Sequence, residues 1–186
     1  MIYYTVVRSD RQTLAVQVKD GEVIVRAPRR VMDKRIKEFV LENYEWIERK
    51  LAEHERNVSA LDMLGVLDEA ERRALIRRAR LVFAERTEYF ARLLDVDYGK
   101  ISIRRQRTRW GSCSAKGDLS FNAALMLAPP EVLDSVVAHE LCHRKHMDHS
   151  SAFYAELESV VPSFRACRKW LRENGEALML RMGNNE

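Results

Sequence analysis

The chain begins with a pattern of alternating apolar and polar residues. Residues 14–18 alternate in this way, Asp20-Gly21 follows, and the alternation then continues as far as Val25. A period of two residues is typical of a half-buried strand, and Asp-Gly is a preferred two-residue hairpin turn. The pattern therefore predicts a small antiparallel sheet within residues 2–27.

Apolar residues spaced three or four positions apart then predict a series of helices. The expected helices lie near residues 32–56, 68–94, 130–147, 151–160 and 163–181, with a strand near 101–107 and a hairpin or tight loop near 113–121. A sheet followed by mainly helical segments predicts an α+β fold. Because residues 57–67 resemble a connector, we expect one sheet-and-helix subdomain in residues 1–57 and a second domain in residues 58–186.

Four of the five histidines lie within residues 139–149, and the first five residues of this stretch read HELCH, an instance of H-E-x-x-H. On a helix, residues i and i+4 share one face, so His139 and His143 can bind one metal ion while Glu140 transfers a proton. The pattern alone also occurs in ordinary helices. The concentration of histidines, the clear helix signal after Pro129 and the further histidines favour a metal site.

A catalytic zinc usually has three protein ligands and a water molecule, so a third ligand is expected. His146 lies seven residues beyond His139, roughly 10 Å along a helix axis, which is too far for one straight helix. A turn after the helix can instead bring His149 back over the metal. We therefore favour His149 over His146 and over a downstream carboxylate, Glu156 or Glu158, in a site for one divalent ion, zinc above others.

Composition and cysteine use place the chain among ordinary globular proteins. Hydrophobic residues make up 46% and charged residues 32% of the 186 positions, and no run of about 18 apolar residues is present. The beginning lacks the apolar block of a signal peptide, and three widely spaced cysteines fit neither a disulfide framework nor a zinc ribbon. We therefore expect a cytoplasmic protein without a membrane partner.

The net charge is only +4, but the basic residues form clusters. The cluster nearest the HELCH motif consists of Arg104, Arg105, Arg107 and Arg109, and it can attract anions such as nucleotide phosphates. Acidic residues are interspersed with the other basic clusters, and no recognised DNA-binding motif is present. A nucleic acid is therefore a weakly supported partner.

Several short motifs together resemble a known family. They are Trp110-Gly111-Ser112-Cys113, Asn122, HELCH, His149-Ser150 and Phe153-Tyr154, and the resemblance is dense from Thr108 to Tyr154. In these residues the chain resembles the YgjP-like metal-dependent hydrolases, a family of zincin metallopeptidases related to the SprT-like proteases. It departs from the family at Asp148, where asparagine is usual, and at the basic pair Arg144-Lys145.

The resemblance implies a zincin-like core, metal ligands at His139, His143 and His149, and a catalytic carboxylate at Glu140. It also implies a small sheet whose edge strand lies along the active-site cleft. We expect this edge strand, and with it the substrate, at Leu119, Ser120, Phe121 and Asn122.

These expectations favour a zinc-dependent peptidase in which Glu140 is the general base for water attack. A second group must stabilise the developing oxyanion, and His146, Tyr154 and Arg109 are the candidates. A peptide or protein substrate is favoured. The alternatives are a metal-dependent nucleotide pyrophosphatase acting on UTP-type substrates, and a DNA-associated SprT-like protease or binding module.

Overall fold

The computed structural model describes residues 2–106 and 108–183, and within helix α2 it describes the backbone but not the side chains of residues 60–64. The chain forms two compact units, Met1–Asp62 and Met63–Glu186. The expected division into a subdomain of residues 1–57 and a domain of residues 58–186 stays a prediction. In the described part of the chain, no helix is long and apolar enough to cross a membrane.

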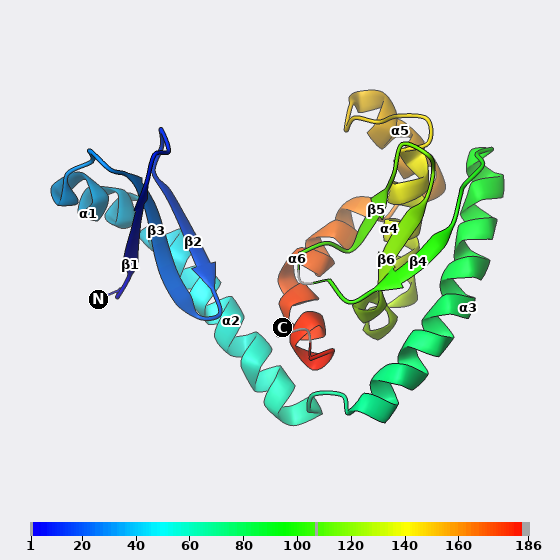
Figure 1. Ribbon diagram of the computed structural model, residues 1–186, viewed down its shortest axis with the longest axis horizontal. Helices are drawn as coiled ribbons and strands as arrows, with labels where there is room; N and C mark the ends of the chain where they lie inside the picture. Colours follow the sequence, from blue (N-terminus) through cyan, green and yellow to red (C-terminus); the bar gives the residue numbers. More distant parts are fainter. Residues whose placement is uncertain (1, 107, 184–186) are drawn as a thin grey trace. The chain divides into compact units, whose positions relative to one another are not determined.

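From residue 2 onward, the first unit is described as a three-stranded sheet and two helices (Figure 1). Its elements are β1 (Thr5–Ser9), β2 (Ala15–Lys19), β3 (Glu22–Pro28), α1 (Asp33–Glu42) and α2 (Tyr44–Leu64). The strand order is β1-β3-β2, with β2 antiparallel and β1 parallel to β3, so the expectation of a wholly antiparallel sheet was wrong. Asp20 and Gly21 both have positive φ, as the predicted hairpin turn requires.

One expected helix is two helices in the structure. The break lies at Asn43, whose side-chain Nδ2 donates a hydrogen bond to the backbone oxygen of Phe39 at 2.8 Å. Asparagine competes in this way for the backbone groups that a continuous helix would use. The second helix then continues to Leu64, through most of the segment expected to be a connector.

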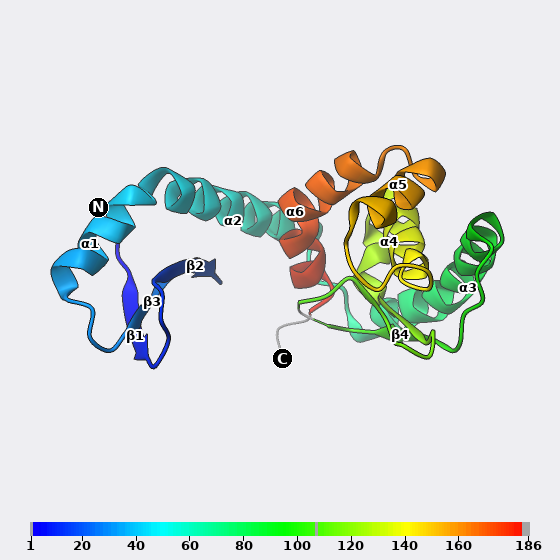
Figure 2. The ribbon, with the colours of Figure 1, turned by 90° about the horizontal axis from the view of Figure 1, so that it is seen from above.

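In its described residues, the second unit contains four α-helices, a second three-stranded sheet and a 3₁₀ helix. Its elements are α3 (Glu69–Leu94), β4 (Ile101–Arg104), β5 (Gly111–Cys113), β6 (Leu119–Asn122), η1 (Ala123–Leu127), α4 (Pro130–Cys142), α5 (Ser151–Val160) and α6 (Phe164–Arg181). Helix α3 begins with the capping box of Asp68 and Glu71. Helices α3 and α6 flank α4 on opposite sides (Figures 1 and 2).

The strand expected at the edge of this sheet lies in its centre. The order is β4-β6-β5, so the segment Leu119, Ser120, Phe121 and Asn122 is hydrogen-bonded on both sides, parallel to β4 and antiparallel to β5. The expected edge assignment was therefore wrong, because β4 occupies the side of β6 that the hairpin with β5 leaves free. The edge strand that packs against α4 is β5.

Helix α4 is buried because it is apolar on most of its surface. Its side chains join a core formed with α3 and β6, in which the rings of Phe83 and Phe121 stack with centroids 4.7 Å apart and planes 7° apart. Neither ring is more than 1% exposed. The stacked pair fixes α3 against the central strand and so holds the layer on which α4 lies.

Replacement of Phe83 by alanine is expected to lower the free energy of unfolding by about 3–5 kcal/mol, because it removes a buried ring and leaves a cavity. Leu81→Ala is the matched control on the same helix, since Leu81 is 74% exposed, and it is expected to change stability by less than about 0.5 kcal/mol. Urea unfolding followed by circular dichroism measures both. Equal effects of the two substitutions would contradict the described core.

Candidate metal centre

Helix α4 ends earlier than the sequence suggested, and this early end shapes the candidate site. It begins at Pro130, as expected, but its last residue is Cys142, and His143 is the C-cap. The chain then turns back. Helix α5 begins at Ser151, where the Ser150 side chain accepts a hydrogen bond from the backbone N–H of Phe153 at 3.4 Å. The turn between the two helices carries His149 toward the last turn of α4.

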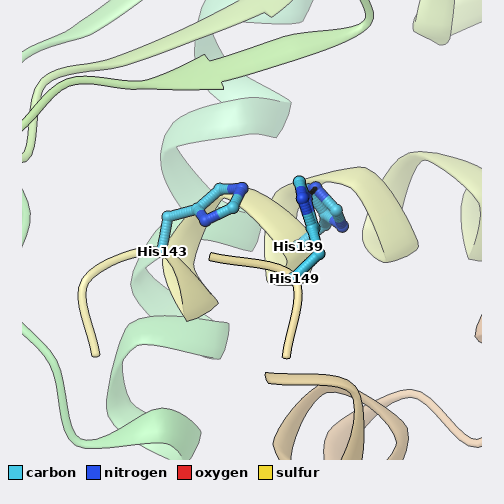
Figure 3. A group of neighbouring side chains, drawn as sticks. All are labelled: His139, His143 and His149. Carbon is cyan, nitrogen blue, oxygen red and sulfur yellow. Dashed lines mark hydrogen bonds between the residues drawn. The ribbon is translucent and has the colours of Figure 1, made fainter. Parts of the chain in front are cut away.

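This reversal brings three histidine side chains together (Figure 3). One ring nitrogen from each of His139, His143 and His149 lies within 4.8 Å of the other two. The Nε2 atoms of His139 and His149 are 3.2 Å apart. Two nitrogens that each lie 2.0–2.1 Å from one tetrahedral zinc ion are about 3.3 Å apart, so the donors and this spacing fit a zinc ion.

The hydrogen bonds and packing of the histidines also suit metal binding. His143 Nδ1 lies 3.0 Å from the backbone oxygen of His146, and since a carbonyl oxygen can only accept, Nδ1 carries the proton and Nε2 keeps its lone pair. Phe153 is fully buried, and its ring centroid lies 4.9 Å from the centroid of each of the three imidazoles. The ring of Phe153 therefore packs against all three imidazoles.

Burial keeps the imidazole of His139 neutral near physiological pH. Desolvation lowers the pKa of His139 to about 4, with smaller contributions from His143, His149 and Arg168. A neutral imidazole offers the lone pair that a metal ion needs. His149 is exposed, so the group of three opens to solvent on one side.

Glu140 lies on the same turn of α4 and is 7% exposed. Desolvation raises the pKa of its carboxyl group to about 7. The carboxylate packs directly against strand β5. A Cβ atom added at Gly111 would lie 2.5 Å from Glu140 Oε1, closer than real side chains allow. Glycine at this position therefore makes room for the buried acid. From the sequence, Gly111 was named only within the family motif and was given no role of its own, although a glycine inside a strand is a signal of close approach.

The other candidates for the third metal ligand, His146, Glu156 and Glu158, form hydrogen bonds or ion pairs elsewhere. His146 Nε2 is 2.8 Å from Glu156 Oε2, and Lys145 holds the other oxygen of Glu156 at 2.7 Å. Glu158 forms an ion pair with Arg165 at 2.7 Å. None of His146, Glu156 and Glu158 belongs to the described group of three histidines.

The three candidates for oxyanion stabilisation differ in how close their side chains lie to the histidine group. The ring of Tyr154 lies 6.2 Å from the ring of His149, beside the histidines. His146 is held by Glu156. The side chain of Arg109 is exposed, and its backbone oxygen accepts a hydrogen bond from Asn122. Of the three, Tyr154 is therefore the side chain with a described contact to the histidine group.

The chain is similar to known metallopeptidases. A family model described as "YgjP-like, metallopeptidase domain" matches residues 12–64 and 66–174, which is most of the chain. Among solved structures, the crystal structure of the metallopeptidase zymogen of Pyrococcus abyssi abylysin is similar at 28% sequence identity, with a TM-score of 0.43. That match covers 48% of this chain and 90% of the other. No curated protein matches the chain.

Metal content distinguishes the third ligand. The wild type is expected to bind about one zinc ion per chain. His139→Ala, His143→Ala and His149→Ala should each lose most of it, while His146→Ala, the matched control, should keep it because its ring is bound to Glu156. Elemental analysis after zinc loading and desalting measures this. Full metal in His149→Ala, or loss only in His146→Ala, would contradict the assignment.

Gly111→Ala is expected to keep the zinc and to lower hydrolysis at least tenfold, since the new methyl group must displace the Glu140 carboxylate rather than a histidine. Ser102→Ala, on the opposite edge strand β4, is the control for a small change in the same sheet. Zinc content and rate are measured together. Normal turnover in Gly111→Ala would show that the close packing is irrelevant to catalysis.

Proposed function

We propose that this chain, which belongs to the YgjP-like metallopeptidase family, is a zinc-dependent peptidase. Its α+β architecture, with the H-E-x-x-H helix packed against a small sheet, is the zincin-like core that the sequence predicted. One observation carries the proposal: three histidine nitrogens from two segments lie within 4.8 Å of one another, next to a buried glutamate on the same helix.

His139, His143 and His149 would hold the zinc ion through their ring nitrogens. A bound zinc ion supplies a Lewis acid that activates water and polarises the scissile carbonyl group. The ring of Phe153 and the hydrogen bond from His143 to the backbone oxygen of His146 keep the imidazoles oriented. The protein therefore provides a preorganised set of donors.

Glu140 acts as the general base in this proposal. It takes a proton from the attacking water and returns it to the leaving amine. Its burial beside Gly111 fixes the carboxylate and keeps bulk water away from it. A cation held by the neighbouring histidines favours the ionised carboxylate, because an opposite charge lowers the pKa that burial raises.

An extended peptide would bind along the outer edge of β5. This strand replaces Leu119–Asn122 as the proposed substrate strand, because β5 is at the edge of the sheet and Gly111 touches Glu140. Backbone hydrogen bonds to an edge strand hold a peptide without regard to its sequence. Tyr154, beside His149, is the proposed stabiliser of the oxyanion.

The arginines expected to bind phosphates do not support nucleotide hydrolysis. Arg104 ends β4, at the sheet edge opposite β5. Arg105 lies close enough to Glu69 of α3 to contribute to lowering the pKa of that carboxyl group. Arg107 lies outside the described residues. No observation favours a nucleotide or a nucleic acid over a peptide.

Glu140→Gln should keep the zinc and the fold and lower peptide hydrolysis by about 100-fold or more, the loss expected for a positioned general base. Glu131→Gln, an exposed acid on the same helix, is the matched control and should retain normal turnover. Zinc-loaded protein is tested against denatured proteins and nucleoside triphosphates in parallel. Near-normal peptide cleavage by Glu140→Gln, or cleavage of triphosphates alone, would overturn the proposal.

A further inference from the structure

A basic hollow lies beside the histidine group, between α5 and α6. Its volume is about 700 Å³. Tyr154 of α5 and Phe164 of α6 provide apolar walls. Four cations of α6 also line it: Arg165, Arg168, Lys169 and Arg172. Because α5 leads directly into α6 (Figure 2), a short stretch of chain builds the whole hollow.

The hollow begins one aromatic ring away from the candidate metal ligands. The ring of Phe164 lies 6.0 Å from the ring of His139, and the ring of Tyr154 lies 6.2 Å from that of His149. The rings of Tyr154 and Phe164 are themselves 6.0 Å apart. The two rings that line the hollow therefore also lie against the histidine group, so the hollow adjoins the candidate metal site.

The charges of the hollow are only partly neutralised by the protein. Arg165 is paired with Glu158, the one acidic residue of the lining, and Lys169 has Glu173 at 4.0 Å. Within the described chain, Arg168 and Arg172 have neither a hydrogen bond nor an ion pair. Two arginine side chains on successive turns of α6 therefore remain available for an anion.

One of these cations, Arg165, also lies at the unfavourable end of helix α6. The N-terminus of a helix carries a partial positive charge, which favours acidic residues there and disfavours basic ones. Helix α6 has no acidic residue in its first turn, where Arg165 lies, and no side chain caps its N-terminus. An anionic group in the hollow would relieve this accumulation of positive charge.

We propose that this hollow is a substrate subsite for a carboxylate of an acidic peptide, bound by Arg168 and Arg172. The inference rests on the proposed peptidase function and names its substrate class. Arginine offers paired N–H donors that match the two oxygens of a carboxylate. Tyr154 and Phe164 contact the apolar part of the bound residue. The carboxylate belongs either to an aspartate or glutamate side chain or to a free peptide C-terminus.

The test is equilibrium binding to the zinc-loaded full-length Glu140→Gln protein, which needs no turnover. Three peptides that are otherwise identical are compared, and the comparison is repeated with the variable residue placed at several positions of the peptide. One has glutamine and blocked ends, one has glutamate and blocked ends, and one has glutamine with a free C-terminus. A carboxylate peptide should bind roughly 3- to 10-fold more tightly than the uncharged one, with the advantage falling at high salt. Preference for the second or third peptide identifies the source of the carboxylate.

Two substitutions and a control test whether Arg168 and Arg172 cause the preference for carboxylate peptides. Arg168→Gln and Arg172→Gln should each reduce it, and the double variant should abolish it. Arg77→Gln removes one charge from an exposed position of α3 that does not line the hollow and should preserve it. All three positions are exposed, so thermal unfolding should match that of Glu140→Gln alone.

Equal binding of the three peptides would overturn the subsite, as would an equal loss of preference in Arg77→Gln. Stronger displacement by inorganic pyrophosphate, with no preference among the peptides, would overturn it in favour of a phosphate ligand. The proposed peptidase function is contradicted by a different result, namely that the zinc-loaded wild type cleaves no peptide. Cleavage without a charge preference leaves the peptidase in place and removes the acidic subsite.

Discussion

The burial of helix α4 is the constraint on which the rest of the second unit depends. A helix enclosed by α3, α6 and a sheet must be apolar, yet its last turn carries His139 and Glu140. Polar groups withdrawn from water are stable only with partners or in altered protonation states. Desolvation accordingly keeps His139 neutral and raises the pKa of Glu140. The packing that stabilises the core thus also determines the chemistry available at the end of the helix.

The geometry of the site depends on local interactions in the segment that follows helix α4. The early end of α4 and the Ser150 cap of α5 determine where His149 lies. The fully buried ring of Phe153 then touches all three imidazoles. A side chain of the hydrophobic core therefore orients polar groups that face solvent, and the cost of ordering them is met during folding rather than during binding.

The features that sequence could predict are those with a local cause. The spacing of HELCH places His139, His143 and Glu140 on one helix turn, and the return of His149 follows from a short turn. Strand order was not predictable in this way, because the parallel pairing of β4 with β6 leaves no trace in either strand's period. The close approach of Gly111 to Glu140 also joins distant segments. The break at Asn43 was not predicted, because Asn43 has the spacing of the apolar residues on one face of a continuous helix.

The positions of His143 and His149 have a thermodynamic consequence. His143 is the C-cap of α4, and His149 immediately precedes the N-cap of α5, so the two residues are the ends of the connection between the helices. A metal ion bound to both, as proposed, closes this connection into a small ring. Because the metal ion would bind the closed form and not the unfolded segment, each tenfold rise in free metal above the dissociation constant adds about 1.4 kcal/mol to the stability of the closed form. The supply of metal would therefore regulate how long this surface segment survives proteolysis, independently of catalysis.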